Sequence, residues 1–265
     1  MRVRAVVAYD GEAFAGFAAN VGVTTVAGTL QQALATATGA EITVTCAGRT
    51  DRGVHALGQV VSFDVAPGTD LERLTRSLRA MVGPSIAIKT LEASADDFDA
   101  RFSARWRRYR YDVVTDPVAV DPFVARVAWL LCEPLDLTAM RQGCAPLLGE
   151  HDFSSFCRRP KSGPDGAEVS LRRRVLSAEW EQPSLGLARF DIVGTAFCHQ
   201  MVRSIVGCLV AVGRGRIRAA DVTAVLAARS RDAAPPIAPP QGLTLMEVGY
   251  SDDPDGRLAL GGPLR

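Results

Sequence analysis

The stretch EITVTCAGRTDRGVHALGQVVSFDV, residues 41–65, decides the first half of the fold. Apolar and polar residues alternate in EITVTC and again in VVSFDV. An alternation with a period of two is typical of strands that are buried on one face. The pattern therefore predicts two antiparallel strands that flank one polar loop, residues 47–56.

Outward from this stretch, strand-like and helix-like patterns alternate along the whole chain. One helix has a clear predicted start, because Thr69 and Glu72 fit a capping box and Gly83-Pro84 follows its apolar stripe. A turn-rich segment at 160–168 predicts a surface loop. The remaining strands are predicted near 2–9, 85–93, 108–115, 171–180, 187–194 and 242–250, and the helices near 25–38, 69–82, 137–148, 197–212 and 219–229.

Each half of the chain thus combines strands with two or more helices. This order predicts an α+β fold with two α/β sandwich domains, residues 1–102 and 103–265, each with helices on one face of an antiparallel sheet. Two such sheets placed side by side would leave a cleft between them.

The overall charge gives little sign of a nucleic-acid partner. The 265 residues carry 30 Lys and Arg against 29 Asp and Glu, a formal net charge of +1, whereas domains that bind nucleic acid are usually basic. The basic residues are nevertheless concentrated at 101–110, 158–161, 172–174 and 214–218, and acidic ones at 92–99 and 252–255. The distribution predicts a local basic cleft.

Compartment and redox state follow from what the sequence lacks. No apolar run approaches the roughly 20 residues that cross a bilayer, and the first residues resemble a strand more than a signal peptide. The six cysteines form no CxxC pair or other metal-ligand spacing. We expect a cytoplasmic protein with reduced thiols, no disulfide framework, no metal and no membrane.

Three segments are candidates for chemistry. The loop GRTDRGVH at 48–55 combines charged residues and glycines between apolar strands, although Asp and Gly also form plain turns. The segment RFSARWRRYRY at 101–111 holds five arginines and four aromatic residues, which suits an RNA groove or an edge strand whose rings face the core. In the third, the helix predicted at 197–212, His199 and Arg203 would share the flank opposite the apolar one.

Together these segments resemble the bacterial tRNA pseudouridine synthase A family. The resemblance rests on GRTDRGVHALGQV, FDARFSARWRRYRYDV, FCHQMVRSIVG and PPQGLTLMEVGY, supported by YDGEAFAGF and LLGEHDFSSF, and it runs from about residue 4 to residue 250. It implies an isomerase that converts uridine to pseudouridine in the tRNA anticodon stem-loop, at positions 38–40. It also implies a homodimer that needs no metal or organic cofactor.

The resemblance assigns roles to residues of the three segments. Asp51 falls on the catalytic aspartate, and Arg49 on an arginine that displaces and holds the target nucleotide. Tyr109 matches the tyrosine that stacks on the uracil, and Arg203 matches an arginine near the catalytic carboxylate, with which it would form an ion pair that keeps Asp51 charged. Further substrate contacts are expected from Leu243, Leu245, Arg108 and Arg110.

Two departures from the family pattern concern possible RNA contacts. Residues 16–20 are GFAAN in place of GFQ-x-Q, and Asp99 stands where FHARF has its histidine. The altered residues 16–20 leave open the same chemistry on another RNA. Two further alternatives are a non-catalytic RNA-binding protein and a two-carboxylate glycoside-cleaving enzyme. The last would need Asp99 or Asp112, which are predicted to be structural. None of the three histidines, at 55, 151 and 199, is expected to be a catalytic base.

Overall fold

The computed structural model describes residues 1–158 and 169–251. It divides into two compact units, and each is described by itself. Unit 1 comprises Met1–Arg105 and Thr244–Tyr250, and unit 2 runs from Trp106 to Leu243. The predicted boundary at 102/103 lies three residues before this division, and residues 244–250, predicted for the second domain, belong to unit 1. The predicted loop at 160–168 lies outside the described residues.

The sheet of unit 1 has the strand order β4-β1-β3-β10, with β2 also paired to β3. Strand β1 lies between two antiparallel neighbours, and β2 and β3 are antiparallel as predicted. Strand β10 instead runs parallel to β3, with Thr244 opposite His55. This direction is allowed because no tight hairpin joins these distant segments. The bounds are β1 Arg2–Tyr9, β2 Thr45–Cys46, β3 His55–Asp64, β4 Ile86–Ala93 and β10 Leu243–Gly249.

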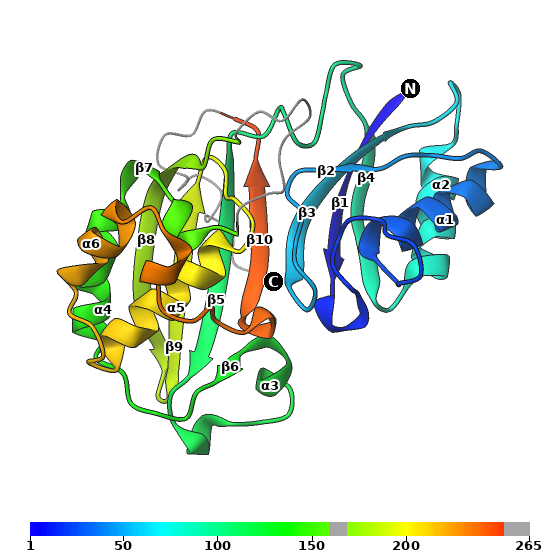
Figure 1. Ribbon diagram of the computed structural model, residues 1–265. Coiled ribbons are helices and arrows are strands. Elements are labelled where there is room, and N and C mark those ends of the chain that lie inside the picture. Colours follow the sequence, from blue (N-terminus) through cyan, green and yellow to red (C-terminus); the bar gives the residue numbers. More distant parts are fainter. Residues whose placement is uncertain (159–168, 252–265) are drawn as a thin grey trace. The chain divides into compact units, whose positions relative to one another are not determined.

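Two helices, α1 (Val26–Thr38) and α2 (Leu71–Val82), pack side by side on this sheet (Figure 1). Thr25 caps α1 and the left-handed Gly39 ends it. The predicted capping box of α2 is wrong by one residue, because the side chain of Asp70, and not of Thr69, accepts the hydrogen bond from the Arg73 N–H. The buried residues of α1 and α2 include Leu30, Leu34, Leu74 and Leu78.

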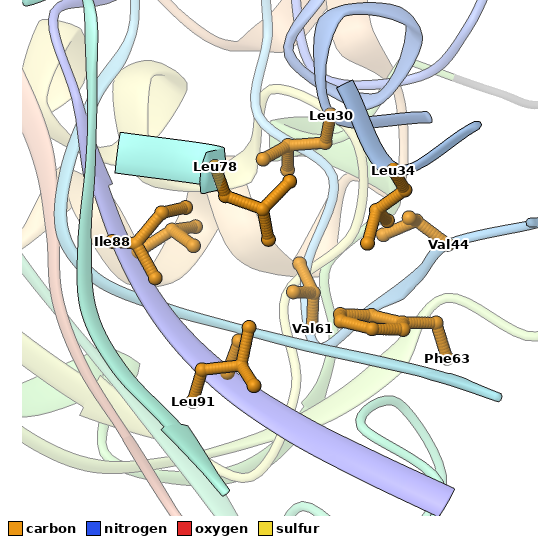
Figure 2. Close-up of a pocket in the computed structure, with 10 residues that line it drawn as sticks. Leu30, Leu34, Val44, Val61, Phe63, Leu78, Ile88 and Leu91 are labelled. Carbon is orange, nitrogen blue, oxygen red and sulfur yellow. The ribbon is translucent and has the colours of Figure 1, made fainter. Parts of the chain in front are cut away.

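The apolar core of unit 1 lies between these helices and the sheet. It leaves a cavity of about 10 Å³, about the minimum space for one water molecule. Figure 2 shows Leu34, Val44, Val61 and Phe63 around it, all without polar atoms in their side chains. This part of the core is therefore apolar and closely packed.

In unit 2 the strand order is β5-β9-β8-β7, and all three pairings are antiparallel. A short strand, β6, pairs parallel with β5, so the predicted purely antiparallel sheet is wrong at this strand as well as at β10. Strand β6 follows a long loop from β5, which allows it to enter in the same direction. The bounds are β5 Trp106–Val114, β6 Trp129–Leu130, β7 Gly149–Asp152, β8 Arg172–Ser184 and β9 Leu187–Gly194.

The helices of unit 2 include α3 (Val124–Val127), α4 (Leu137–Cys144), α5 (Met201–Gly213) and α6 (Asp221–Ala227). Figure 1 shows α4, α5 and α6 on one side of β8 and β9. Each unit is thus a sheet with helices on one face, which confirms the predicted α+β class. No helix among the described residues is long and apolar enough to cross a bilayer.

Helix α5 differs from its prediction in both start and exposure. It begins at Met201, because Gln200 adopts a left-handed conformation with φ of 67°. His199 therefore precedes the helix and does not share a flank with Arg203. Every residue of α5 is buried except Arg203, which is half-buried, so that this arginine marks the point where the helix meets solvent.

Candidate active site

Asp51 lies in the loop between β2 and β3, which the surrounding backbone holds at several points. The Thr50 carbonyl accepts a hydrogen bond from the Phe17 N–H at 3.1 Å, and the Asp51 carbonyl accepts one from Val54 at 3.2 Å. Gly53 adopts φ of 77°, which favours glycine. Asp51 itself is half-buried and Arg49 is exposed. The loop thus presents a carboxylate and a guanidinium two residues apart.

A buried network of hydrogen bonds fixes the backbone of this loop. The Gln59 amide donates to the Gly48 carbonyl at 2.6 Å and accepts from the Gly48 N–H at 3.3 Å. It also donates to the Tyr9 hydroxyl at 3.3 Å, and that hydroxyl lies 2.8 Å from the Thr50 hydroxyl. Gln59 is fully buried, and Tyr9 and Thr50 nearly so. Because buried polar groups are costly to leave unpaired, this network determines where the backbone on either side of Arg49 lies.

His55, at the C-terminal end of the same loop, contacts the turn after β1. Its ring is buried, and its Nδ1 atom lies 3.1 Å from the Gly11 nitrogen and 3.2 Å from an Asp10 oxygen. Gly11 approaches so closely that a Cβ atom there would overlap the Val54 carbonyl. The imidazole is therefore engaged with the turn after β1.

In unit 2, Tyr109 and Tyr111 occupy one face of β5, opposite Ile192 and Phe190 of β9. The Tyr109 ring meets Phe197 edge-on, with 5.3 Å between centroids. Tyr111 is fully buried and its hydroxyl donates to the Pro239 carbonyl at 2.7 Å. Both rings are thus fixed by packing.

Arg203 lies near Tyr111 and is tied to the segment that precedes β10. Its Nε atom donates to the Ala238 carbonyl at 2.9 Å, and its own carbonyl accepts from the Ala238 N–H at 3.1 Å. Burial raises the pKa of Tyr111 above its ordinary value, and the positive charge of Arg203 acts in the opposite direction. Arg203 therefore contributes positive charge next to a neutral phenol.

The arginines of β5 are more buried than the sequence suggested. Arg107 and Arg108 are buried, and Arg107 donates to the Thr195 carbonyl at 2.6 Å. Arg110 lies 3.3 Å from Asp191, its partner on β9. The leucines expected to contact the base are buried too: Leu243 is 6% exposed and Leu245 is fully buried.

Two acidic residues predicted to be structural have structural partners. Asp112 binds Arg189 across the strands at 2.8 Å, and Asp99 accepts hydrogen bonds from the N–H groups of Arg101 and Phe102. Asp112 is thereby occupied by an ion pair. The glycoside-cleaving alternative accordingly loses its candidate second carboxylates.

Comparison with known proteins gives the chain its family. A family model described as tRNA pseudouridine synthase matches residues 5–103 and 144–251. The chain belongs to the tRNA pseudouridine synthase family. Among curated relatives, the tRNA pseudouridine synthase A of Chromobacterium violaceum is 41% identical over 96% of this chain and 94% of its own. The proteins of the same name from Frankia casuarinae and Ralstonia nicotianae are 41% and 40% identical, covering 96% and 95% of this chain and 91% and 90% of their own.

The family match covers some of the predicted site residues and not others. The matched ranges of the synthase model include Asp51, Arg49 and Arg203, as well as both leucines, whereas residues 104–143, which hold Tyr109, lie outside them. Asp51 and Arg49 belong to unit 1, and Tyr109, Arg108, Arg110 and Arg203 to unit 2. The assignments of roles to these residues stay predictions.

Sequence reasoning missed the residues that hold the loop of this synthase. Gln59 carries a usable signal, because it shares the period-two phase of Val61 and Phe63 and is the polar member of an otherwise inward-facing set. Tyr9 and Thr50 carry none, since the network that joins them spans 41 residues of sequence.

Proposed function

We propose that this chain isomerises uridine to pseudouridine in tRNA, with Asp51 as its catalytic carboxylate. The observation that carries the proposal is the half-buried position of Asp51 on a loop fixed by Gln59, Tyr9 and Thr50, in a chain of this family. A catalytic group must be held in place by its surroundings, and buried hydrogen bonds do this here.

The proposed reaction is a rearrangement within one nucleotide, which needs no redox or group-transfer cofactor. The N1–C1′ bond of uridine breaks, the uracil turns while bound, and a C5–C1′ bond forms. The proton on C5 leaves and N1 takes up a proton. A carboxylate beside C1′ has two possible roles, either as a nucleophile at that carbon or as the base that removes a proton.

The remaining residues would hold the nucleotide during this exchange. Tyr109 would stack on the detached uracil, and Arg203 would form an ion pair with Asp51. Arg49 would fill the place of the flipped-out base, which offsets part of the few kcal/mol that flipping costs. Arg108 and Arg110 would bind the substrate, and Leu243 or Leu245 would contact the base.

The proposed substrate is the anticodon stem-loop, at positions 38–40, because the relatives' name refers to tRNA and the sequence resembles that family. The altered residues 16–20 leave the same chemistry on another RNA as the alternative. Mapping pseudouridine in RNA from cells that lack this protein separates the two. Loss confined to positions 38–40 of tRNA supports the first, and loss elsewhere supports the second.

Two further parts of the proposal concern the cellular location and the oligomeric state of the protein. We place the enzyme in the cytoplasm, where tRNA is modified, and propose that it acts as a homodimer. Val118, Phe123 and Leu185 of unit 2 are at least 84% exposed, and apolar side chains that gather in one exposed patch often mark interfaces. A single Phe123→Asp substitution should then shift the protein from dimer to monomer in light scattering.

The decisive test of the proposal is Asp51→Asn. This isosteric change should abolish tritium release from tRNA that carries 5-tritiated uridine, while tRNA affinity stays within about threefold because phosphate contacts dominate binding. Asp97→Asn, at an exposed acidic residue, is the matched control and should remain fully active. Turnover by Asp51→Asn would refute the role of Asp51. If the chain without substitutions binds tRNA tightly but releases no tritium, the protein is instead a non-catalytic RNA-binding protein.

A further inference from the structure

Two cysteines that are far apart in the sequence are joined in unit 2. Cys157 and Cys198 form a disulfide, with Cα atoms 5.9 Å apart and 41 residues between them in the sequence. This separation lies within the usual range of about 4.4–6.8 Å for Cα atoms of bridged cysteines. The expectation of reduced thiols throughout is wrong for this pair, whereas Cys46, Cys132, Cys144 and Cys208 are free.

The backbone brings the pair together independently of the bond. The N–H of Arg158 donates to the carbonyl of His199 at 3.0 Å, directly beside both cysteines. Cys157 follows a short 3₁₀ turn, Ser154–Phe156, whose residues are all buried. The Ser155 hydroxyl accepts a hydrogen bond from the Ser230 N–H at 3.1 Å, which fixes this turn within unit 2. The two thiols of a reduced chain would therefore remain neighbours.

The two cysteine residues differ in their exposure to solvent. Cys157 is fully buried, whereas Cys198 is half-buried and precedes the exposed His199. An oxidant that arrives from solvent would therefore reach Cys198 first, and Cys157 would be the neighbouring thiol that completes the bond. Such an arrangement of an accessible cysteine and a resolving one is typical of redox-sensitive pairs.

We propose that Cys157 and Cys198 form a reversible oxidation site for hydroperoxides. With hydrogen peroxide, the Cys198 thiolate attacks one oxygen atom and the O–O bond breaks. The departing hydroxide takes up the proton that the thiol released, so that a sulfenic acid and one molecule of water are formed. The Cys157 thiolate then attacks the Cys198 sulfur, the S–O bond breaks, the S–S bond forms and a second water leaves. The two thiols lose two electrons and hydrogen peroxide gains them; excess thiol reductant reverses the step by exchange.

The disulfide includes a cysteine in a turn that contacts other elements of unit 2. The Met201 N–H donates to the Cys198 carbonyl at 3.0 Å, so this turn begins helix α5. The preceding residue, Phe197, contacts Tyr109. Closing the disulfide ties the start of α5 to the buried turn at Ser154–Phe156. The inference does not depend on the proposed function, since bond formation and stability are both measured without RNA.

The test uses the full chain, reduced with dithiothreitol, desalted and exposed to hydrogen peroxide. Remaining thiols are then alkylated under denaturing conditions and counted by intact mass. The reduced chain should take six labels and the oxidised chain four, because four of its six cysteines are free. Peptide mapping should find the cross-link between Cys157 and Cys198, and dithiothreitol should restore all six labels. Oxidation should raise the melting temperature by about 5–10 °C, since the bond closes a long loop in the unfolded chain.

Variants separate this site from general thiol oxidation. Cys198→Ser should neither cross-link nor change its melting temperature with peroxide, whereas Cys132→Ser should still lose two labels on oxidation. Cys157→Ala gives a second variant without the bond. Six labels after peroxide treatment, a Cys198 that stops at the sulfenic or sulfinic acid, or a cross-link to another cysteine would each overturn the proposal.

Discussion

The two units hold their predicted site residues by different means. In unit 1, Asp51 lies on a loop, and buried hydrogen bonds from Gln59 and the Tyr9 hydroxyl fix the backbone around it. In unit 2, Tyr109 and Arg203 lie on a strand and a helix, where ladder pairing and apolar packing set their positions. A loop that is fixed by polar contacts can be disturbed without unfolding the unit, whereas a residue on β5 or α5 moves only when its element moves.

The largest expected effect is that of Gln59→Leu, which tests the polar support of the loop. The change leaves both Gly48 backbone groups without the amide partner, which should cost about 2–4 kcal/mol of unfolding free energy. Displacement of the loop should lower kcat about 100-fold. KM for tRNA should change far less than kcat, because Gln59 is fully buried and phosphate contacts dominate RNA binding. Steady-state kinetics and urea unfolding measure both effects.

Gln31→Leu is the matched control for this substitution. Gln31 accepts one hydrogen bond from the Val44 N–H at 3.2 Å, on helix α1 and away from the loop. We expect a loss of about 1 kcal/mol in stability and no change in kcat. An equal fall in kcat for the two variants would mean that lost stability, and not loop position, explains the effect of Gln59→Leu.

The apolar core of unit 1 offers the complementary test, in Leu34→Ala. Leu34 is nearly fully buried beside the small cavity of Figure 2, so the larger cavity should cost about 2–5 kcal/mol in unfolding free energy. Well below the melting temperature, kcat should stay unchanged, because the hydrogen bonds around Asp51 remain. A large kcat loss here would erase the distinction between polar support and apolar packing.

A smaller effect is expected on the face of β5. Tyr109→Phe keeps the ring and its edge-on contact with Phe197, whereas Tyr109→Leu removes both. Base–aromatic stacking contributes about 1–3 kcal/mol, so Tyr109→Leu should lower kcat/KM by a further factor of about 5–150 relative to Tyr109→Phe. Equal losses in the two variants would rule out stacking as the role of the ring.

The smallest effect is expected away from both predicted residue sets, at Ser154 of unit 2. The hydroxyl of Ser154 donates to Asp152 and, as the main cause, holds the pKa of that carboxyl below its usual value. A carboxyl with a lowered pKa in the folded state stabilises the protein above its unfolded pKa of about 4, and this contribution disappears as pH falls through the folded value. Ser154→Ala should therefore cost about 1 kcal/mol at pH 7, and the cost should shrink as the pH falls through the folded pKa of Asp152. A stability difference that does not shrink as the pH is lowered would contradict this explanation.

Regular elements with a clear period could be predicted from the sequence, and short or irregular ones could not. Strand β1 and helix α1 match their predictions almost residue by residue, because their buried positions repeat at two or 3.6 residues. Strand β2 is shorter than its alternation suggests, since the Val44 N–H binds the Gln31 side chain and not another strand. Elements as short as β6 give no periodic signal.

The start of α5 and the contacts around the candidate site needed the structure. The apolar pattern at 197–212 continues through the turn before α5, and no local signal announces the left-handed Gln200. The loop motif predicted where Asp51 would lie, but not that Gln59 supports it. The disulfide could not be inferred either, because its cysteines are separated by 41 residues and form no known motif.

The late position of β10 in the chain has a consequence for synthesis on the ribosome. Strand β3 receives its partner from residues 244 and 245, and Tyr250 places its ring 4.9 Å from the Arg4 guanidinium and its hydroxyl 2.7 Å from the Ala100 carbonyl. Domains often fold from the N-terminus as the chain emerges. Here the first unit stays incomplete until residue 250 leaves the exit tunnel. A nascent chain that stalls in the second unit would therefore expose the edge of β3 beside the Asp51 loop.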